Sequence, residues 1–338
     1  MLPARFFHVA YVTEPEPSPD PIGFLLGVLA EPGATVLLIA AAVAGLALLI
    51  GWELFADRLA PWQRFVDRAW SYRDLVPWML RLSFGLVLIG AGLTRVLFAP
   101  DVQIAGWPYV LLTALGFLLL LGFAVRPAAL LGLAAYLVAI VLDPRVTAML
   151  EVTGGLAAVA LLGPGRPSLD DLLRAAFPSA PGATVATKAP GHGRYEDLVP
   201  LLVRLGLGGS LLASGIADKI LIYDQGLEAV AKYHLTALVP VDPGLWVVGA
   251  AVAEAGLGIA ILLGLATRLT AILAFGFLTL AMFGLPDDPV VAHVGLFGCC
   301  SVLVVLGAGS WSLEGIRGRW ASSQGRSRDR HRLAGADA

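Results

Sequence analysis

The chain has 338 residues, of which 58% are apolar and only 14% are charged, and its mean hydropathy is +0.81. Soluble domains carry about 25% charged residues, so this composition excludes a soluble protein. The net charge of −2 does not favour a nucleic-acid partner. Cys299 and Cys300 are adjacent within an apolar run and cannot provide a disulfide framework or an iron–sulfur site, so we interpret them as small apolar fillers.

Nine apolar stretches approach or reach the length needed to cross about 30 Å of hydrocarbon at about 1.5 Å per helical residue. In lipid, backbone N–H and C=O groups that are not bonded within the protein find no hydrogen-bond partners. The sequence therefore predicts an all-α polytopic membrane protein with about nine transmembrane helices. In chain order we expect them at residues 33–55, 76–98, 107–124, 128–142, 147–162, 198–221, 244–266, 268–285 and 290–307.

Three further segments are predicted to lie outside the bilayer core. In residues 59–74, aromatic residues recur at helical spacing among arginines, which is typical of an interfacial amphipathic helix; a loop that caps the bundle is the alternative. Residues 227–238 are expected to form a short helix on the opposite side. Residues 317–338 form a basic tail that we expect near anionic lipid. The first thirty residues do not resemble a cleaved signal peptide.

The basic residues predict the orientation of the chain. Ten lysines and arginines in loops and six tail arginines fall on one side of the expected helices, whereas acidic residues dominate the other side. We therefore expect the protein in the plasma membrane with its N-terminus outside and its C-terminus in the cytoplasm. Nine crossings fit this arrangement.

The sequence contains an internal duplication. Residues 74–77 recur as 197–200, with Arg81 and Arg204 at the same offset, and two later motifs repeat in the same order. Both copies hold four expected helices and begin on the same side, which predicts parallel repeats. We expect these segments: 1–75 with the first helix and the amphipathic helix, 76–193 with the first repeat and a linker, 194–316 with the second repeat, and 317–338 as the tail.

The second repeat resembles a known family over about residues 194–316, and the first repeat matches only in outline. The motifs that carry the resemblance are Arg204, Gly215 to Lys219, Val239-Pro240, Glu254, residues 262–268 and residues 307–313. This order is similar to that of the DoxX/DoxD family of small four-helix membrane proteins.

The resemblance implies a membrane subunit linked to respiratory sulfur or thiol oxidation, of the kind that includes the large subunit of a thiosulfate:quinone oxidoreductase. It implies a quinone as cofactor and other membrane or extracytoplasmic subunits as partners. It does not define the substrate, because one fold serves many functions. The polar residues of the motif occur only in the second repeat, because Leu112 stands at the position of Glu254.

Several ionisable residues fall within or beside the expected helices of the second repeat. Ionisable groups are costly in a membrane and so suggest a partner or a function. We expect Asp218, Lys219 and His293 in one outer layer with Glu254 deeper. The functional hypothesis is a quinone or proton-transfer pocket in which Glu254 and His293 are catalytic and Lys219, Asp218 and Tyr223 contact the cofactor. The alternative is an interfacial ion pair with Glu254 hydrogen-bonded for helix packing.

Other ionisable residues have less specific interpretations. Arg204 is a candidate cofactor ligand, but its duplication at Arg81 favours a shared structural task, such as binding main-chain carbonyls or lipid phosphate. Glu151 is expected to pair with Arg145 or Arg95.

The sequence shows no dinucleotide motif, phosphate-binding loop or metal cluster, and too few histidines in helices for a haem. The competing function hypotheses are a quinone-interacting subunit, a non-catalytic anchoring or assembly subunit, and a small-solute transporter.

Overall fold

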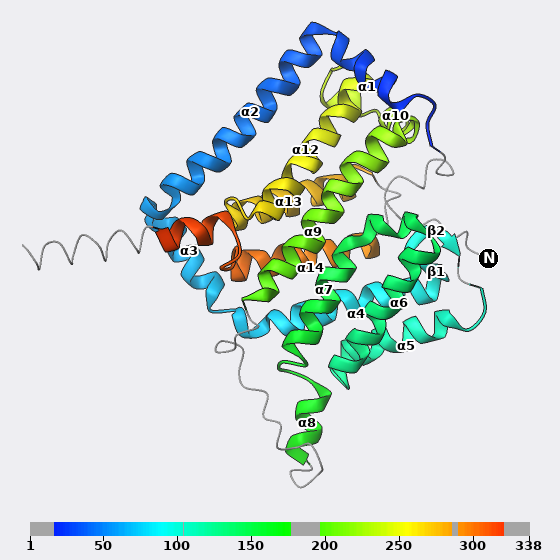
Figure 1. The fold of residues 1–338 in the computed structure, drawn as a ribbon, viewed down its shortest axis with the longest axis vertical. Coiled ribbons are helices and arrows are strands. Elements are labelled where there is room, and N and C mark those ends of the chain that lie inside the picture. The colour runs from blue at the N-terminus through cyan, green and yellow to red at the C-terminus, as the bar shows by residue number, and fades with distance from the viewer. Residues whose placement is uncertain (1–16, 104, 177–196, 286–289, 321–338) are drawn as a thin grey trace, which may run out of the picture.

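The computed structural model describes residues 17–103, 105–176, 197–285 and 290–320. The expected linker (177–193), the tail beyond residue 320 and the first sixteen residues lie outside this description. The helices of Figure 1 are α1 (Pro21–Ala30), α2 (Pro32–Phe55), η2 (Ala56–Arg58), α3 (Ala60–Trp70), η3 (Arg73–Leu75), α4 (Val76–Thr94), α5 (Pro108–Leu121), α6 (Val125–Leu142), η4 (Pro144–Met149), α7 (Leu150–Leu162), α8 (Leu169–Ala176), α9 (Leu198–Ile216), η5 (Ala217–Leu221), α10 (Tyr223–Lys232), α11 (Leu235–Leu238), α12 (Pro243–Leu263), α13 (Thr267–Gly284) and α14 (Val290–Leu306).

The structure confirms the all-α polytopic fold. Seven helical segments of the described chain are long and apolar enough to cross a membrane, and α5 and α14 are shorter apolar helices. These nine correspond to the nine expected stretches. The expected helix at 76–98 ends earlier, at Thr94, because Arg95 adopts the left-handed conformation. It is followed by a short antiparallel pair of strands, β1 (Val96–Leu97) and β2 (Ala99–Gln103).

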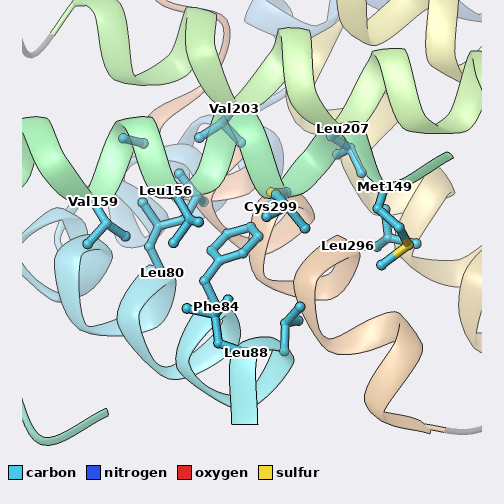
Figure 2. Packing of buried hydrophobic residues seen from close by; sticks show 14 of the residues in the cluster. Leu80, Phe84, Leu88, Met149, Leu156, Val159, Val203, Leu207, Leu296 and Cys299 are labelled. Carbon is cyan, nitrogen blue, oxygen red and sulfur yellow. The ribbon is translucent and has the colours of Figure 1, made fainter. Parts of the chain in front are cut away.

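Helices α4 to α7 form one group of four, and α9, α12, α13 and α14 form another. Within each group the first two helices pack closely, α4 on α5 and α9 on α12. The groups meet because α7 packs on α9 and α14 packs on α4. Figure 2 shows side chains of these four helices and of η4 in one shared core. The labelled residues are Leu80, Phe84, Leu88, Met149, Leu156, Val159, Val203, Leu207, Leu296 and Cys299.

Glycines allow helices of the two groups to pack closely against each other. A Cβ atom added to Gly154 on α7 would overlap the carbonyl oxygen of Leu202, and Gly206 on α9 lies beside it. In the other group, a Cβ atom at Gly298 on α14 would overlap the side chain of Ser83 on α4. Each of these two contacts therefore depends on a glycine in the fourth helix of one group: Gly154 in α7 for the contact with α9, and Gly298 in α14 for the contact with α4.

Gly154→Ala is expected to destabilise the protein by about 2 kcal/mol, because the added methyl group meets backbone rather than a movable side chain. Gly249→Ala in α12 is the matched control, since nothing lies within 4 Å of its added Cβ atom. An alanine in a helix interior is more favourable than a glycine by about 0.5–1 kcal/mol, so the control should gain stability. Thermal denaturation in detergent measures both. Equal effects would contradict close packing at Gly154.

The N-terminal helices lie at the periphery of the bundle. In Figure 1, α2 runs along one side, and its end meets α3 and a helix at residues 313–320, here called the C-terminal helix. Leu38 is the one buried residue of α2, so this helix faces lipid or another protein. Residues 60–70 form a helix, α3, with a strongly amphipathic sequence, as expected for the segment 59–74.

Candidate functional site

A buried ion pair joins the two closely packed helices of the second group. The ammonium of Lys219 contacts a carboxylate oxygen of Glu254, whose side chain is 4% exposed, whereas that of Lys219 is 17% exposed. Glu254 lies in the middle of α12, and Lys219 lies in η5, which continues α9. We expected Lys219 in an outer layer and Glu254 deeper, and the structure brings their side chains into contact.

A widened helical turn places the residues around this ion pair. Residues Ala217–Leu221 form a π-helical turn at the end of α9, a distortion that often occurs at functional sites. Asp218 in this turn accepts a hydrogen bond of 2.7 Å from the hydroxyl of Ser214. Ser210, Ser214 and Asp218 are spaced four residues apart and therefore share one face of the helix. A row of polar groups thus leads along α9 to the ion pair.

Glycines bring α9 and α12 close enough for Lys219 to reach Glu254. An added Cβ atom at Gly208 would lie 2.7 Å from the carbonyl oxygen of Gly258, and one at Gly215 would lie 2.9 Å from the amide nitrogen of Ala255. Both glycines face α12 over two turns of α9. The close backbones leave no room for another side chain between these helices at those points.

Tyr223 and His293 lie on other elements. The hydroxyl of Tyr223 donates to the carbonyl oxygen of Pro19 at 2.8 Å, and its ring stacks on Phe24 with centroids 4.0 Å apart. His293 on α14 is fully buried, with its ring centroid 5.9 Å from that of Phe297. The main neighbours of α14 are α4, α13 and α9, whereas those of α12 are α9, α10 and α13. The structure therefore groups Asp218, Lys219 and Glu254, and places Tyr223 against the N-terminal segment.

Arg204 lies near the opposite end of α9 and is 2% exposed. Its guanidinium donates to four main-chain carbonyls: Ile261 at 2.8 Å, Leu262 at 2.5 Å, Ala308 at 2.9 Å and Trp311 at 2.7 Å. These carbonyls belong to the end of α12 and to the segment after α14. Arg204 therefore ties three parts of the second group together.

Arg81 makes the matching contacts in the first group. It is 1% exposed and donates to the carbonyls of Leu119 at 3.1 Å, of Pro167 at 3.0 Å and of Pro164. These belong to the end of α5 and to the segment after α7. The duplication predicted a shared structural task for the two arginines. Both bind main-chain carbonyls, which is one of the two tasks expected.

Glu151 is a buried carboxyl group whose partner the sequence did not identify. One oxygen of Glu151 contacts the hydroxyl of Ser210 on α9, and the other has no hydrogen-bond partner among the described residues. Ser210 also lies 2.6 Å from the carbonyl oxygen of Ala148. A hydroxyl has one proton, so Ser210 donates to both oxygens only by sharing that proton. The polar row of α9 thus begins at a carboxyl group supplied by the first group.

The expected ion pairs of Glu151 were wrong. The guanidinium of Arg145 donates to both carboxylate oxygens of Asp143, and this hydrogen bonding holds the pKa of the Asp143 carboxyl below its usual value. Arg95 lies over the ring of Tyr109, 4.7 Å from its centroid. The carboxyl group of Glu151 instead contacts Ser210.

The fold and the buried ion pair define a multi-pass α-helical membrane protein with an ionisable centre in its second group of helices. Residues 199–287 match the family model described as DoxX. The matched segment includes Arg204, Asp218, Lys219 and Glu254 but ends before His293. No curated protein and no solved structure matches the chain.

Proposed function

We propose that this protein is an integral membrane subunit of a respiratory or sulfur- or thiol-linked quinone oxidoreductase. The observation that carries the proposal is the buried pair of Lys219 and Glu254 beside Asp218. An ion pair in a low-dielectric interior contributes little net stability compared with apolar residues of similar size. Its position within the segment that matches DoxX therefore favours a chemical role over a purely structural one.

The groups at this centre fit the headgroup of a quinone. The ammonium of Lys219 can donate hydrogen bonds to a carbonyl oxygen, and the carboxyl groups of Glu254 and Asp218 can take up protons. A bound quinone would supply the two-electron chemistry. Lys219 would orient a carbonyl oxygen, and Glu254 would hold a proton within reach of it. Asp218, which bonds to Ser214, would continue the path toward the membrane surface.

The quinone proposal includes a location. We place the protein in the plasma membrane with the N-terminus outside and the C-terminus in the cytoplasm, because basic residues concentrate on the side of the C-terminus. Asp218 and Lys219 then face the outer half of the bilayer. A proton that Glu254 exchanges with a bound quinone would then pass through the outer half of the bilayer.

We also propose that residues 76–176 and 198–316 are copies of one four-helix unit. Arg81 and Arg204 bind carbonyls at equivalent places in the two groups. The contact of Gly154 with α9 and that of Gly298 with α4 join the groups reciprocally. The first copy retains this scaffold but has Leu112 instead of a glutamate at the centre. The first copy would thus support the second, which keeps the polar residues.

A non-catalytic anchoring subunit is the second candidate. The observation that favours it is the exposed surface of α2, on which apolar residues such as Val36, Ile39 and Val43 are each at least 58% exposed. Such a surface suits other membrane or extracytoplasmic subunits as well as lipid. Recovery of a complex that binds no quinone would favour this candidate.

Glu254→Gln is expected to lower quinone-linked turnover of the native complex at least tenfold and to cost less stability than the loss of Lys219, because the carboxyl of Asp218 still faces the ammonium. The amide keeps the size of the side chain and can accept from Lys219, but it cannot exchange a proton. Glu151→Gln, at a second buried glutamate that contacts Ser210 rather than Lys219, should lower turnover less than Glu254→Gln because it lies at the far end of the polar row. Wild-type turnover in Glu254→Gln would end the proton-transfer role of this residue.

A further inference from the structure

A cavity of about 260 Å³ lies at the end of α2, away from the ion pair of Lys219 and Glu254. Its walls are the last turn of α2, α3, the start of α13 and the C-terminal helix, which meet on one side of the bundle in Figure 1. A second, mostly apolar cavity of about 440 Å³ adjoins it, since Trp52 and Trp62 line both. Ligand sites in proteins typically occupy about 300–1,000 Å³, so the two cavities together are large enough for an amphiphile.

The first cavity contains charges of both signs. Three carboxyl groups, those of Glu53, Asp57 and Glu314, line it together with the guanidinium groups of Arg268 and Arg317. Arg317 lies 3.4 Å from Glu53 and 3.6 Å from Asp57. With all five groups ionised, the carboxylates exceed the guanidinium groups by one. The cavity therefore suits a ligand that carries a cationic group as well as an anionic one.

An unsatisfied donor also lines this cavity. The indole N–H of Trp52 is buried and has no hydrogen-bond partner among the described residues. The edge of its ring packs on Trp62, with centroids 5.0 Å apart. A buried donor without an acceptor is unfavourable, and an oxygen atom of a ligand in the cavity would satisfy it.

The second cavity continues from these tryptophans along an apolar surface. Leu59, Pro61 and Phe65 of the α3 region and Ile272 of α13 line it. α3 has the amphipathic sequence of a helix that lies at the membrane interface. A polar cavity and an apolar one thus adjoin at the depth where the headgroup and the acyl chain of a lipid meet.

We propose that these two cavities form a binding site for a zwitterionic phospholipid with a primary-amine headgroup. The phosphate oxygens accept from the N–H of Trp52 and from Arg317. The ammonium group donates to the carboxylates of Glu53 and Asp57, and the acyl chains lie against Phe65 and Ile272. The excess of one carboxylate selects an amine-bearing lipid over an anionic one. A basic surface without such an excess would instead prefer the anionic lipid.

The test measures lipid binding to the full-length protein by native mass spectrometry after delipidation. The probes are phosphatidylethanolamine, phosphatidylglycerol and glycerophosphoethanolamine, with matched acyl chains in the two lipids. We expect phosphatidylethanolamine to bind at least tenfold more tightly than phosphatidylglycerol. Equal binding of the two lipids would overturn the proposal. Binding of glycerophosphoethanolamine as tight as that of the lipid would overturn the assignment to a membrane lipid.

Two variants locate the binding to this site. Trp52→Phe keeps an aromatic ring but removes the N–H, and it should weaken phosphatidylethanolamine binding about tenfold, the usual effect of one hydrogen bond to a charged group. Trp107→Phe, at an exposed tryptophan in the first group, is the matched control and should leave binding unchanged. Asp57→Asn removes the excess negative charge at a side chain that is 75% exposed, so folding should persist while the preference between the lipids shrinks. Unchanged preference in this variant would overturn the proposal.

Discussion

Arg204→Met is expected to destabilise the protein by about 4 kcal/mol. Arg204 donates to four main-chain carbonyls that belong to α12 and to the segment after α14. Each hydrogen bond to a charged group contributes about 1.5–3 kcal/mol, and buried carbonyls without donors add a penalty. Some of this loss is recovered because water can enter near the helix end. The measurement is the free energy of unfolding in mixed micelles.

Three further variants provide comparisons for Arg204→Met. Arg81→Met should show a similar loss, since Arg81 binds three carbonyls in the first group. Arg68→Met, at an exposed position of α3, should change stability by less than about 0.5 kcal/mol. Arg204→Lys should be intermediate, because an ammonium cannot reproduce the planar set of donors. A stable Arg204→Met protein would show that these carbonyls are satisfied in another way.

Lys219→Met is expected to cost about 3–5 kcal/mol, the usual loss when one partner of a buried ion pair is removed. The cost is high because Glu254 is the deeper partner, at 4% exposure of its side chain. The double variant Lys219→Met with Glu254→Leu should recover part of this loss, since it removes the carboxylate of Glu254 and leaves beside the pair only the carboxyl group of Asp218, which keeps its hydrogen bond from Ser214. Thermal denaturation of the single and double variants measures the difference.

Lys232→Met is the control for this second experiment, because Lys232 is exposed on α10 and its change should be small. If the double variant is as unstable as Lys219→Met, the loss comes from packing rather than from the unpaired charge. Such a result would contradict the ion pair as the main interaction of Glu254.

The hydropathy of the chain was enough to predict the spanning helices, but not every feature between them. A long apolar run can form one kind of regular structure in lipid, so its location follows from composition. The helix before Arg95 ends early and continues as β1 and β2, which depends on local backbone conformation. The π-helical turn at Ala217–Leu221 is likewise a local distortion of a continuous apolar helix, and no periodicity in the sequence predicts it.

The candidate site was predicted in part. Lys219 and Glu254 were expected in one polar region because both are costly in an apolar environment, but at different depths, and their direct contact comes from the structure. The contact of Glu151 with Ser210 could not be predicted, because it joins the two groups of helices, and their relative position is fixed by the fit of Gly154 against Gly206. The order of the helices in the sequence predicts which helices are neighbours within a group. The contacts between the two groups depend instead on how closely their helix surfaces fit together.

The unequal lengths of α2 and α5 have a consequence for the surrounding bilayer. α2 has 24 residues and α5 has 14, which correspond to about 36 Å and about 21 Å at 1.5 Å per residue. A hydrocarbon core about 30 Å thick matches neither. The lipid annulus must therefore be thinned beside α5, where Phe117 and Leu121 are exposed, while α2 tilts. This asymmetry makes the elastic strain of the membrane uneven around the protein.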